Sequence, residues 1–138
     1  MTLYVSTPQA QCADISVDHD TITISGEIEI GDFEVFSSKA TLLNNAVVLQ
    51  GSYGGKLLEA LKIRELVRAK QFSTYVHTRC ESSCSLIWMA GAQRFKTEKA
   101  LVGFHSAHYE SGEVNRIGNT AIEAFLWKLE RLTKRLNR

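Results

Sequence analysis

The stretch GSYGGKLLEALKIRELVRAK, residues 51–70, is the part of the sequence that decides the fold. It follows the short apolar run AVVL at residues 46–49, which is typical of a buried strand. The glycines favour a tight turn, because glycine adopts positive φ angles without steric cost. Apolar residues then recur at helical spacing, and basic residues occupy the last turn. The stretch therefore predicts a buried strand, a glycine turn and an amphipathic helix.

Strand and helix patterns alternate along the rest of the chain. Alternating β-branched residues predict a strand over residues 21–30, within which Gly26 marks a bulge or turn. Asp32 is expected to cap a helix that runs through Leu43. Further elements are expected as a strand at 74–77, a short buried helix at 82–90, a strand at 100–105 and a helix at 120–138. This order predicts an α/β fold with crossover connections.

The composition indicates one ordinary domain. The chain has 138 residues, 44% hydrophobic and 22% charged, a balance that argues against both a disordered chain and a membrane span. A formal net charge of +1 gives no general attraction to nucleic acid. We therefore expect a single domain over residues 1–138, with residues 1–19 as a flexible N-terminal segment. We expect no nucleic-acid partner and no membrane span.

Three local features carry potential chemistry. Gly54 and Gly55 precede a helix. There they either allow a tight turn with positive φ or expose backbone N–H groups that could bind an oxyanion. Ser82 starts an apolar helix, a position where serine is commonly a cap but where a nucleophile also gains a neighbouring N–H donor. His105 ends an apolar strand, as a structural residue or as the base that a serine nucleophile requires. These residues by themselves leave both interpretations open.

A metal set is a further alternative. His77, Cys80, Cys84, His105 and His108 come within tolerance of zinc-ligand spacing, although the two groups lie far apart in the sequence. The competing interpretations are two buried thiols or one local disulfide between the two cysteines. We expect no bound metal and no cofactor.

The order of three segments adds a family resemblance. Residues 51–70, followed by CESSCSLIWMAGAQR at 80–94 and ALVGFHSAH at 100–108, resemble the ClpP/crotonase superfamily. The likeness is greatest to small ClpP-like serine peptidases of bacteria, which are often periplasmic, and covers roughly residues 20–137. It implies an α/β fold built as a ClpP/crotonase-like spiral of strand–strand–helix units.

The resemblance implies a serine hydrolase, most plausibly a peptidase. Ser82 matches the nucleophile, because it precedes an Ala-Gly pair by the helix length of the family, and His105 matches the general base. Gly54 and Gly55 match the glycine pair whose backbone supplies part of the oxyanion hole, and the N–H of Ser83 would supply the rest.

The acidic third member of the triad departs from the family pattern. In Clp peptidases it follows the long helix after the histidine, whereas here no aspartate occurs after Asp32. Glu110 and Glu113, in the loop after His105, are the candidates for orienting the imidazole. The alternatives are an acid that is absent or one removed by truncation. A Ser–His dyad without it is expected to be slow, because losing this acid lowers kcat about 10⁴-fold in a well-studied triad.

The resemblance also implies a peptide or protein substrate and a homo-oligomer. In an oxidising compartment, a disulfide between Cys80 and Cys84 is expected to clamp the turn around Ser82. The sequence leaves the compartment unknown, cytoplasmic if the chain is complete as written and periplasmic or secreted as the alternative. The competing functions are a catalytically inactive binding or scaffold protein of the same fold, a domain stabilised by zinc, and an acyl-CoA enzyme of the crotonase branch.

Overall fold

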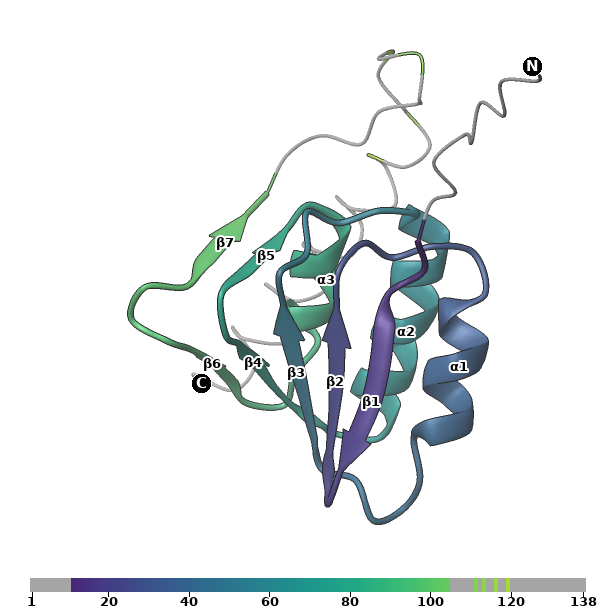
Figure 1. The fold of residues 1–138 in the computed structure, drawn as a ribbon, viewed down its shortest axis with the longest axis vertical. Coiled ribbons are helices and arrows are strands. Elements are labelled where there is room, and N and C mark those ends of the chain that lie inside the picture. Colours follow the sequence, from purple (N-terminus) through teal and green to yellow (C-terminus); the bar gives the residue numbers. More distant parts are fainter. Residues whose placement is uncertain (1–10, 105–110, 112, 114–115, 117–118, 120–138) are drawn as a thin grey trace, which may run out of the picture. The chain divides into compact units, whose positions relative to one another are not determined.

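The computed structural model describes residues 11–104 together with residues 111, 113, 116 and 119. The elements named below all belong to the compact unit of residues 1–104 (Figure 1). The helix expected at 120–138 lies outside the described residues, and a single domain over residues 1–138 stays a prediction. In chain order, the elements are β1 (Asp14–Asp18), β2 (Thr21–Ser25), α1 (Asp32–Lys39), β3 (Ala46–Gln50), α2 (Leu57–Ala69), β4 (Ser73–Val76), β5 (Arg79–Glu81), α3 (Ser83–Met89), β6 (Arg94–Lys96) and β7 (Leu101–Gly103).

A five-stranded sheet forms the centre of this unit. Its strand order is β1-β2-β3-β4-β6, with β1 antiparallel to β2 and the remaining pairs parallel. The register places Ile22 beside Val47 and Ile24 beside Leu49, and these four side chains are buried. Helices α1 and α2 lie side by side next to the sheet, and α3 contacts both α2 and β4 (Figure 1).

A second layer of extended chain follows the ends of the parallel strands. Strand β5 pairs in parallel with β7, which places Cys80 beside Val102. Isolated bridges continue this layer, because Ser52 pairs with Cys80 and Ile28 pairs with Gly55. Strands β2, β3 and β4 therefore each continue into a second extended segment and then into a helix. This repeat is the strand–strand–helix spiral that the sequence predicted.

The sequence analysis did not predict three short strands, β1, β5 and β6. Strands β5 and β6 have three residues each, which is too short for an alternating pattern to be recognised. Strand β1 has the pattern DISVD, in which Ile15 is the buried residue and pairs with Ile24 of β2. Residues 14–18 are thus a strand of the central sheet, so the expectation of a flexible segment over residues 1–19 is wrong for them.

Helix α1 also differs from its expected form. Asp32 is its first helical residue and not its N-cap, a position that Gly31 occupies at a φ of 99°. The Asp32 carboxylate instead accepts the backbone N–H groups of Glu29, at 2.7 Å, and Ala13, at 3.1 Å. The helix ends at Lys39, and Leu43 is 82% exposed, because the chain turns before the predicted apolar stripe is complete.

A carboxylate from α2 accepts a hydrogen bond from a backbone N–H in the first turn of α1. Glu59 is buried, and its Oε2 accepts the backbone N–H of Phe33 at 3.0 Å, while Oε1 accepts Lys62 Nζ at 3.1 Å. The first N–H groups of a helix have no partner inside that helix, so Glu59 acts as a tertiary cap. The hydrogen bond from Phe33 holds the pKa of Glu59 below its ordinary value, against the opposing effect of burial.

This lowered pKa predicts an acid-sensitive contribution to stability. The ionised form stabilises the fold above the ordinary pKa of 4.5, and its contribution is lost as the pH falls through the folded-state pKa. We predict that Glu59→Gln lowers the free energy of unfolding at pH 7 by about 1 kcal/mol, the difference between a charged and a neutral acceptor. Urea unfolding at pH 7, 4 and 3 measures this difference, which should shrink with acid. Glu98→Gln, at an exposed position between β6 and β7, is the control; an equal loss there contradicts the prediction.

Candidate functional site

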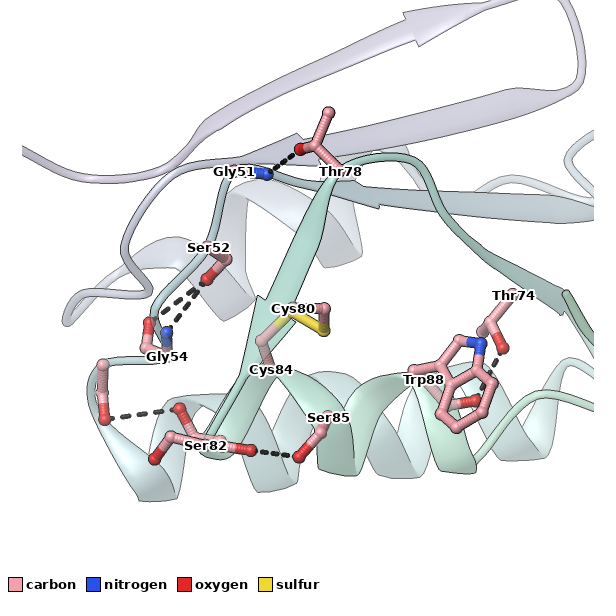
Figure 2. Close-up of a disulfide and its surroundings, with 12 residues drawn as sticks. Gly51, Ser52, Gly54, Thr74, Thr78, Cys80, Ser82, Cys84, Ser85 and Trp88 are labelled. Carbon is pink, nitrogen blue, oxygen red and sulfur yellow. Dashed lines mark hydrogen bonds between the residues drawn. A yellow bond between two sulfur atoms is a disulfide. The ribbon is translucent and has the colours of Figure 1, made fainter. Parts of the chain in front are cut away.

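Ser82 lies at the junction of β5 and α3 with a strained backbone. Its φ is 55° and its ψ is −127°, a conformation that costs a non-glycine residue about 1–3 kcal/mol and persists only where the surroundings impose it. The N–H of Ser82 donates to the carbonyl of Gly103 at 2.9 Å. Its own carbonyl accepts both the N–H and the hydroxyl of Ser85 (Figure 2). Hydrogen bonds therefore hold the strained residue on both sides.

The side chain of Ser82 does not form the expected helix cap. A serine N-cap normally accepts a backbone N–H from the first helical turn, but α3 has no such side-chain hydrogen bond. Ser82 is half-buried, and within residues 11–104 its hydroxyl has no hydrogen-bond partner. Within these residues the hydroxyl is therefore not committed to a capping hydrogen bond.

The glycine turn packs directly against this serine. Gly54 and Gly55 have φ angles of 111° and 131°, which favour glycine. A Cβ atom at Gly54 would lie 2.7 Å from the Cβ of Ser82, and a Cβ at Gly55 would lie 2.1 Å from the carbonyl oxygen of Ile28. Glycine is required here both for its backbone conformation and for the space that it leaves.

Backbone hydrogen bonds fix the direction of this turn. The N–H of Ile28 donates to the carbonyl of Gly54, and the N–H of Lys56 donates to the carbonyl of Ile28, both at 2.8 Å. The β-bridge between Ile28 and Gly55 thus uses the carbonyl of Gly54 and the N–H of Lys56. The N–H of Gly55 takes no part in this bridge. On the side facing α3, the carbonyl of Gly55 accepts the hydroxyl of Ser83 at 3.3 Å. The turn and the start of α3 are therefore joined directly.

Ser52 orders the turn, and sequence reasoning missed it. The residue is 1% exposed, and its Oγ accepts the N–H of Gly54 at 3.2 Å (Figure 2). Its backbone is fixed to β5, because its N–H donates to Arg79 and its carbonyl accepts the N–H of Glu81. The spacing of a serine two residues before the glycine pair is typical of a serine-stabilised turn, and it is the signal that could have identified Ser52.

A disulfide spans the strained turn. The structure joins Cys80 of β5 to Cys84 of α3, with their Cα atoms 5.3 Å apart and both residues fully buried (Figure 2). Zinc binds cysteine as the thiolate, so this bonded pair offers no zinc ligand. The part of the chain that the structure describes also contains no group of three metal-binding side chains. The zinc alternative therefore requires a reduced pair, which differs from the form described here.

The remaining candidate residues belong to the second unit of the chain, residues 105–138. His105, His108 and Glu110 lie outside the described residues. Glu113 is exposed, and its N–H donates to Ser111 Oγ at 3.5 Å, within the second unit of the chain. The pairing of Ser82 with His105 and an orienting acid stays a prediction.

A small charged and aromatic cluster lines β5 beside Ser82. The Arg79 guanidinium lies 4.7 Å from the centre of the Tyr53 ring, and its Nη1 is 3.5 Å from Glu81 Oε2. Both charged side chains are one-third exposed. The Glu81 side chain packs over Gly103, where a Cβ would come within 3.1 Å of Glu81 Cγ. Arg79 and Glu81 thus lie on the partly exposed face of the strand that leads into the candidate nucleophile.

No family model and no curated protein matches this chain, but solved structures do. A ClpP1 mutant from Listeria monocytogenes matches with a TM-score of 0.56 and 22% identity, over 86% of this chain and 68% of that one. A mutant of the 1510-N membrane-bound stomatin-specific protease matches with a TM-score of 0.58 and 12% identity, over 79% of this chain and 60% of that one. A protein named as a putative enoyl-CoA hydratase, from Streptomyces coelicolor A3(2), matches with a TM-score of 0.42 and 13% identity, over 74% of this chain and 51% of that one.

The chain has the ClpP/crotonase fold, which confirms the fold class predicted from the sequence. At these identities the likeness is one of fold, and the chain spans 60% of the length of the stomatin-specific protease. Among the described helices, none is long and apolar enough to cross a membrane.

The close packing of Gly55 predicts a severe effect of adding one methyl group. Gly55→Ala should lower the free energy of unfolding by about 3 kcal/mol or more, because the new Cβ meets rigid backbone and the φ angle is strained for alanine. Gly51→Ala is the matched control, since Gly51 also has a positive φ, at 59°, but nothing lies within 4 Å of the position of its Cβ. Urea unfolding compares the two variants. A loss for Gly55→Ala no larger than that for Gly51→Ala would contradict the packing described.

Proposed function

We propose that the protein is a serine hydrolase acting on peptide or protein substrates, with Ser82 as its nucleophile. The observation that carries the proposal is the position of the Ser82 hydroxyl, unpaired among the described residues at a strained strand-to-helix turn. The α/β-hydrolases, a different fold, also present their nucleophilic serine from a strained strand-to-helix turn. The fold shared with a ClpP1 and with a stomatin-specific protease supports a peptidase in particular.

His105 is the proposed general base. The Ser82 oxygen attacks the substrate carbonyl carbon while its proton passes to the imidazole. The tetrahedral intermediate then collapses, the imidazolium protonates the leaving amine, and an acyl group remains on Ser82. Water, deprotonated by the same imidazole, releases the acyl group as a carboxylic acid and restores the serine hydroxyl.

The oxyanion of that intermediate is proposed to bind two backbone N–H groups. Ser83 supplies one, because the first N–H groups of a helix have no partner within it. Gly55 supplies the other, since its N–H is not used in the bridge to Ile28. The Gly54 N–H is already engaged by Ser52 Oγ, so Gly54 contributes by its shape rather than as a donor. In a well-studied serine protease of another fold, losing one such donor lowers kcat about 10²–10³-fold.

Glu110 or Glu113 remains the proposed orienting acid, and a Ser–His dyad is the alternative. The proposed assembly is a homo-oligomer, and the proposed chemistry needs no cofactor. The rival function in the same fold is binding or scaffolding without catalysis, which retains the disulfide and the glycine turn but has no use for a reactive serine. An acyl-CoA enzyme would use the backbone donors without a nucleophilic serine. Reactivity of Ser82 therefore separates these functions.

Labelling by a fluorophosphonate tests the nucleophile. We predict that the folded protein is labelled at one site, and that Ser82→Ala abolishes labelling, because no other serine among the described residues lies at a strained turn before a helix. Mass spectrometry of the labelled peptide identifies the residue. Ser38→Ala, an exposed serine on α1, is the control and should be labelled like the natural sequence. A folded natural protein that is not labelled at Ser82 would leave the binding or scaffold function in its place.

Substitution of the proposed base gives a second test. His105→Ala should slow fluorophosphonate labelling of Ser82 by about 10²–10⁴-fold, the usual contribution of general-base catalysis. His19→Ala removes an exposed histidine from the turn between β1 and β2 and should leave the rate unchanged. Equal labelling rates for both variants would remove His105 from the proposed mechanism while leaving Ser82 in it.

A further inference from the structure

We propose that the disulfide between Cys80 and Cys84 is the positioning device of the candidate active site, and that Ser82 is reactive only while this bond is intact. The inference rests on the proposed hydrolase function. It assigns a role in regulation to the bond, because the same sequence would then be inactive in a reducing compartment and active in an oxidising one.

The position of the bond is the first argument. Cys80 is the central residue of β5, Cys84 lies in the first turn of α3, and Ser82 is midway between them. The bond therefore closes a small covalent ring around the strained residue (Figure 2). Within residues 11–104 it is the only covalent link between the second layer and α3 apart from the chain itself.

The strain of Ser82 is the second argument. A non-glycine residue keeps a positive φ only where its neighbours over-determine it. One neighbour is fixed firmly, because Cys80 is bridged to Ser52 on one side and paired with Val102 on the other. The disulfide transfers this rigidity to the first turn of α3, which otherwise meets the second layer through single hydrogen bonds such as that from Ser82 to Gly103.

The tight contact with the glycine turn is the third argument. Gly54 approaches Ser82 so closely that one methyl group would not fit between them. A small displacement of α3 would therefore change the distance from the Ser82 hydroxyl to the Gly55 N–H and separate the proposed nucleophile from its oxyanion donors. A misplacement of about 1 Å can lower a catalytic rate about 100-fold.

An external dithiol supplies the electrons and protons that open the disulfide. The reductant gives two electrons to the disulfide, which takes up two protons and becomes two thiols; a dithiol reductant leaves as its own disulfide. Both sulfur-bearing residues are fully buried, so reduction requires a brief local opening of the start of α3. The rate of reduction is therefore limited by the rate of this opening.

The test compares labelling with folding in one sample. In a Cys12→Ala background, which removes the free, exposed cysteine, the protein is reduced with a dithiol in mild urea and returned to buffer. The rate of fluorophosphonate labelling is measured beside circular dichroism and thermal unfolding. We expect labelling to fall by about 10–100-fold while the dichroism at 25 °C is retained, and to recover on re-oxidation. The Cys80→Ala/Cys84→Ala protein should behave like the reduced form, with a slower maximal rate of labelling rather than weaker probe binding.

Each result decides the matter. Unchanged labelling of the reduced, folded protein overturns the positioning role and leaves the hydrolase standing. Labelling that falls only in proportion to the loss of circular dichroism also overturns the positioning role, because the disulfide then contributes to the stability of the fold alone. Absence of labelling in the oxidised protein refutes the hydrolase itself. Cys12→Ala alone is the control for the background and should label and unfold like the natural sequence, because Cys12 is exposed.

Discussion

The packing of the Gly54–Gly55 turn between Ile28 and Ser82 is the contact on which the rest of the structure depends. A side chain at either glycine would collide with the main chain on one side or with the serine on the other. Because both glycines lack a Cβ, the turn pairs with Ile28 and still meets the start of α3. This contact joins three successive strand–strand–helix units. Ile28 comes from the first unit, the glycine turn from the second and Ser82 from the third.

The polar groups around this contact are arranged before any ligand arrives. Ser52 holds the Gly54 N–H, Ser83 holds the Gly55 carbonyl, and Ser85 holds the carbonyl of Ser82. Buried polar groups are costly unless they are paired, so each of these serines is fixed by the burial that surrounds it. The hydroxyl of Ser82 is different, because its strained backbone turns it away from the usual capping role. Such fixed surroundings reduce the reorganisation that a charged intermediate would otherwise require.

Local sequence patterns predicted the long elements well. The apolar run at residues 46–49 and the helical spacing after Lys56 reappear as β3 and α2, since these patterns reflect burial on one or both faces. The three-residue strands β5 and β6 were missed because their pairing comes from distant partners and not from their own residues. The capping role of Asp32 was misassigned for a similar reason: its carboxylate meets backbone N–H groups outside the helix.

The sequence by itself determined the α/β order, the glycine turn and the serine at the start of a short buried helix, because each is encoded by residues adjacent in the chain. Only the tertiary structure decided that Ser82 has a positive φ and an unpaired hydroxyl within the described residues, and which of the interpretations left open for Cys80 and Cys84 holds. These features arise where β5 is held between Ser52 and β7. Contacts between segments so far apart in sequence leave no periodic pattern in any one of them.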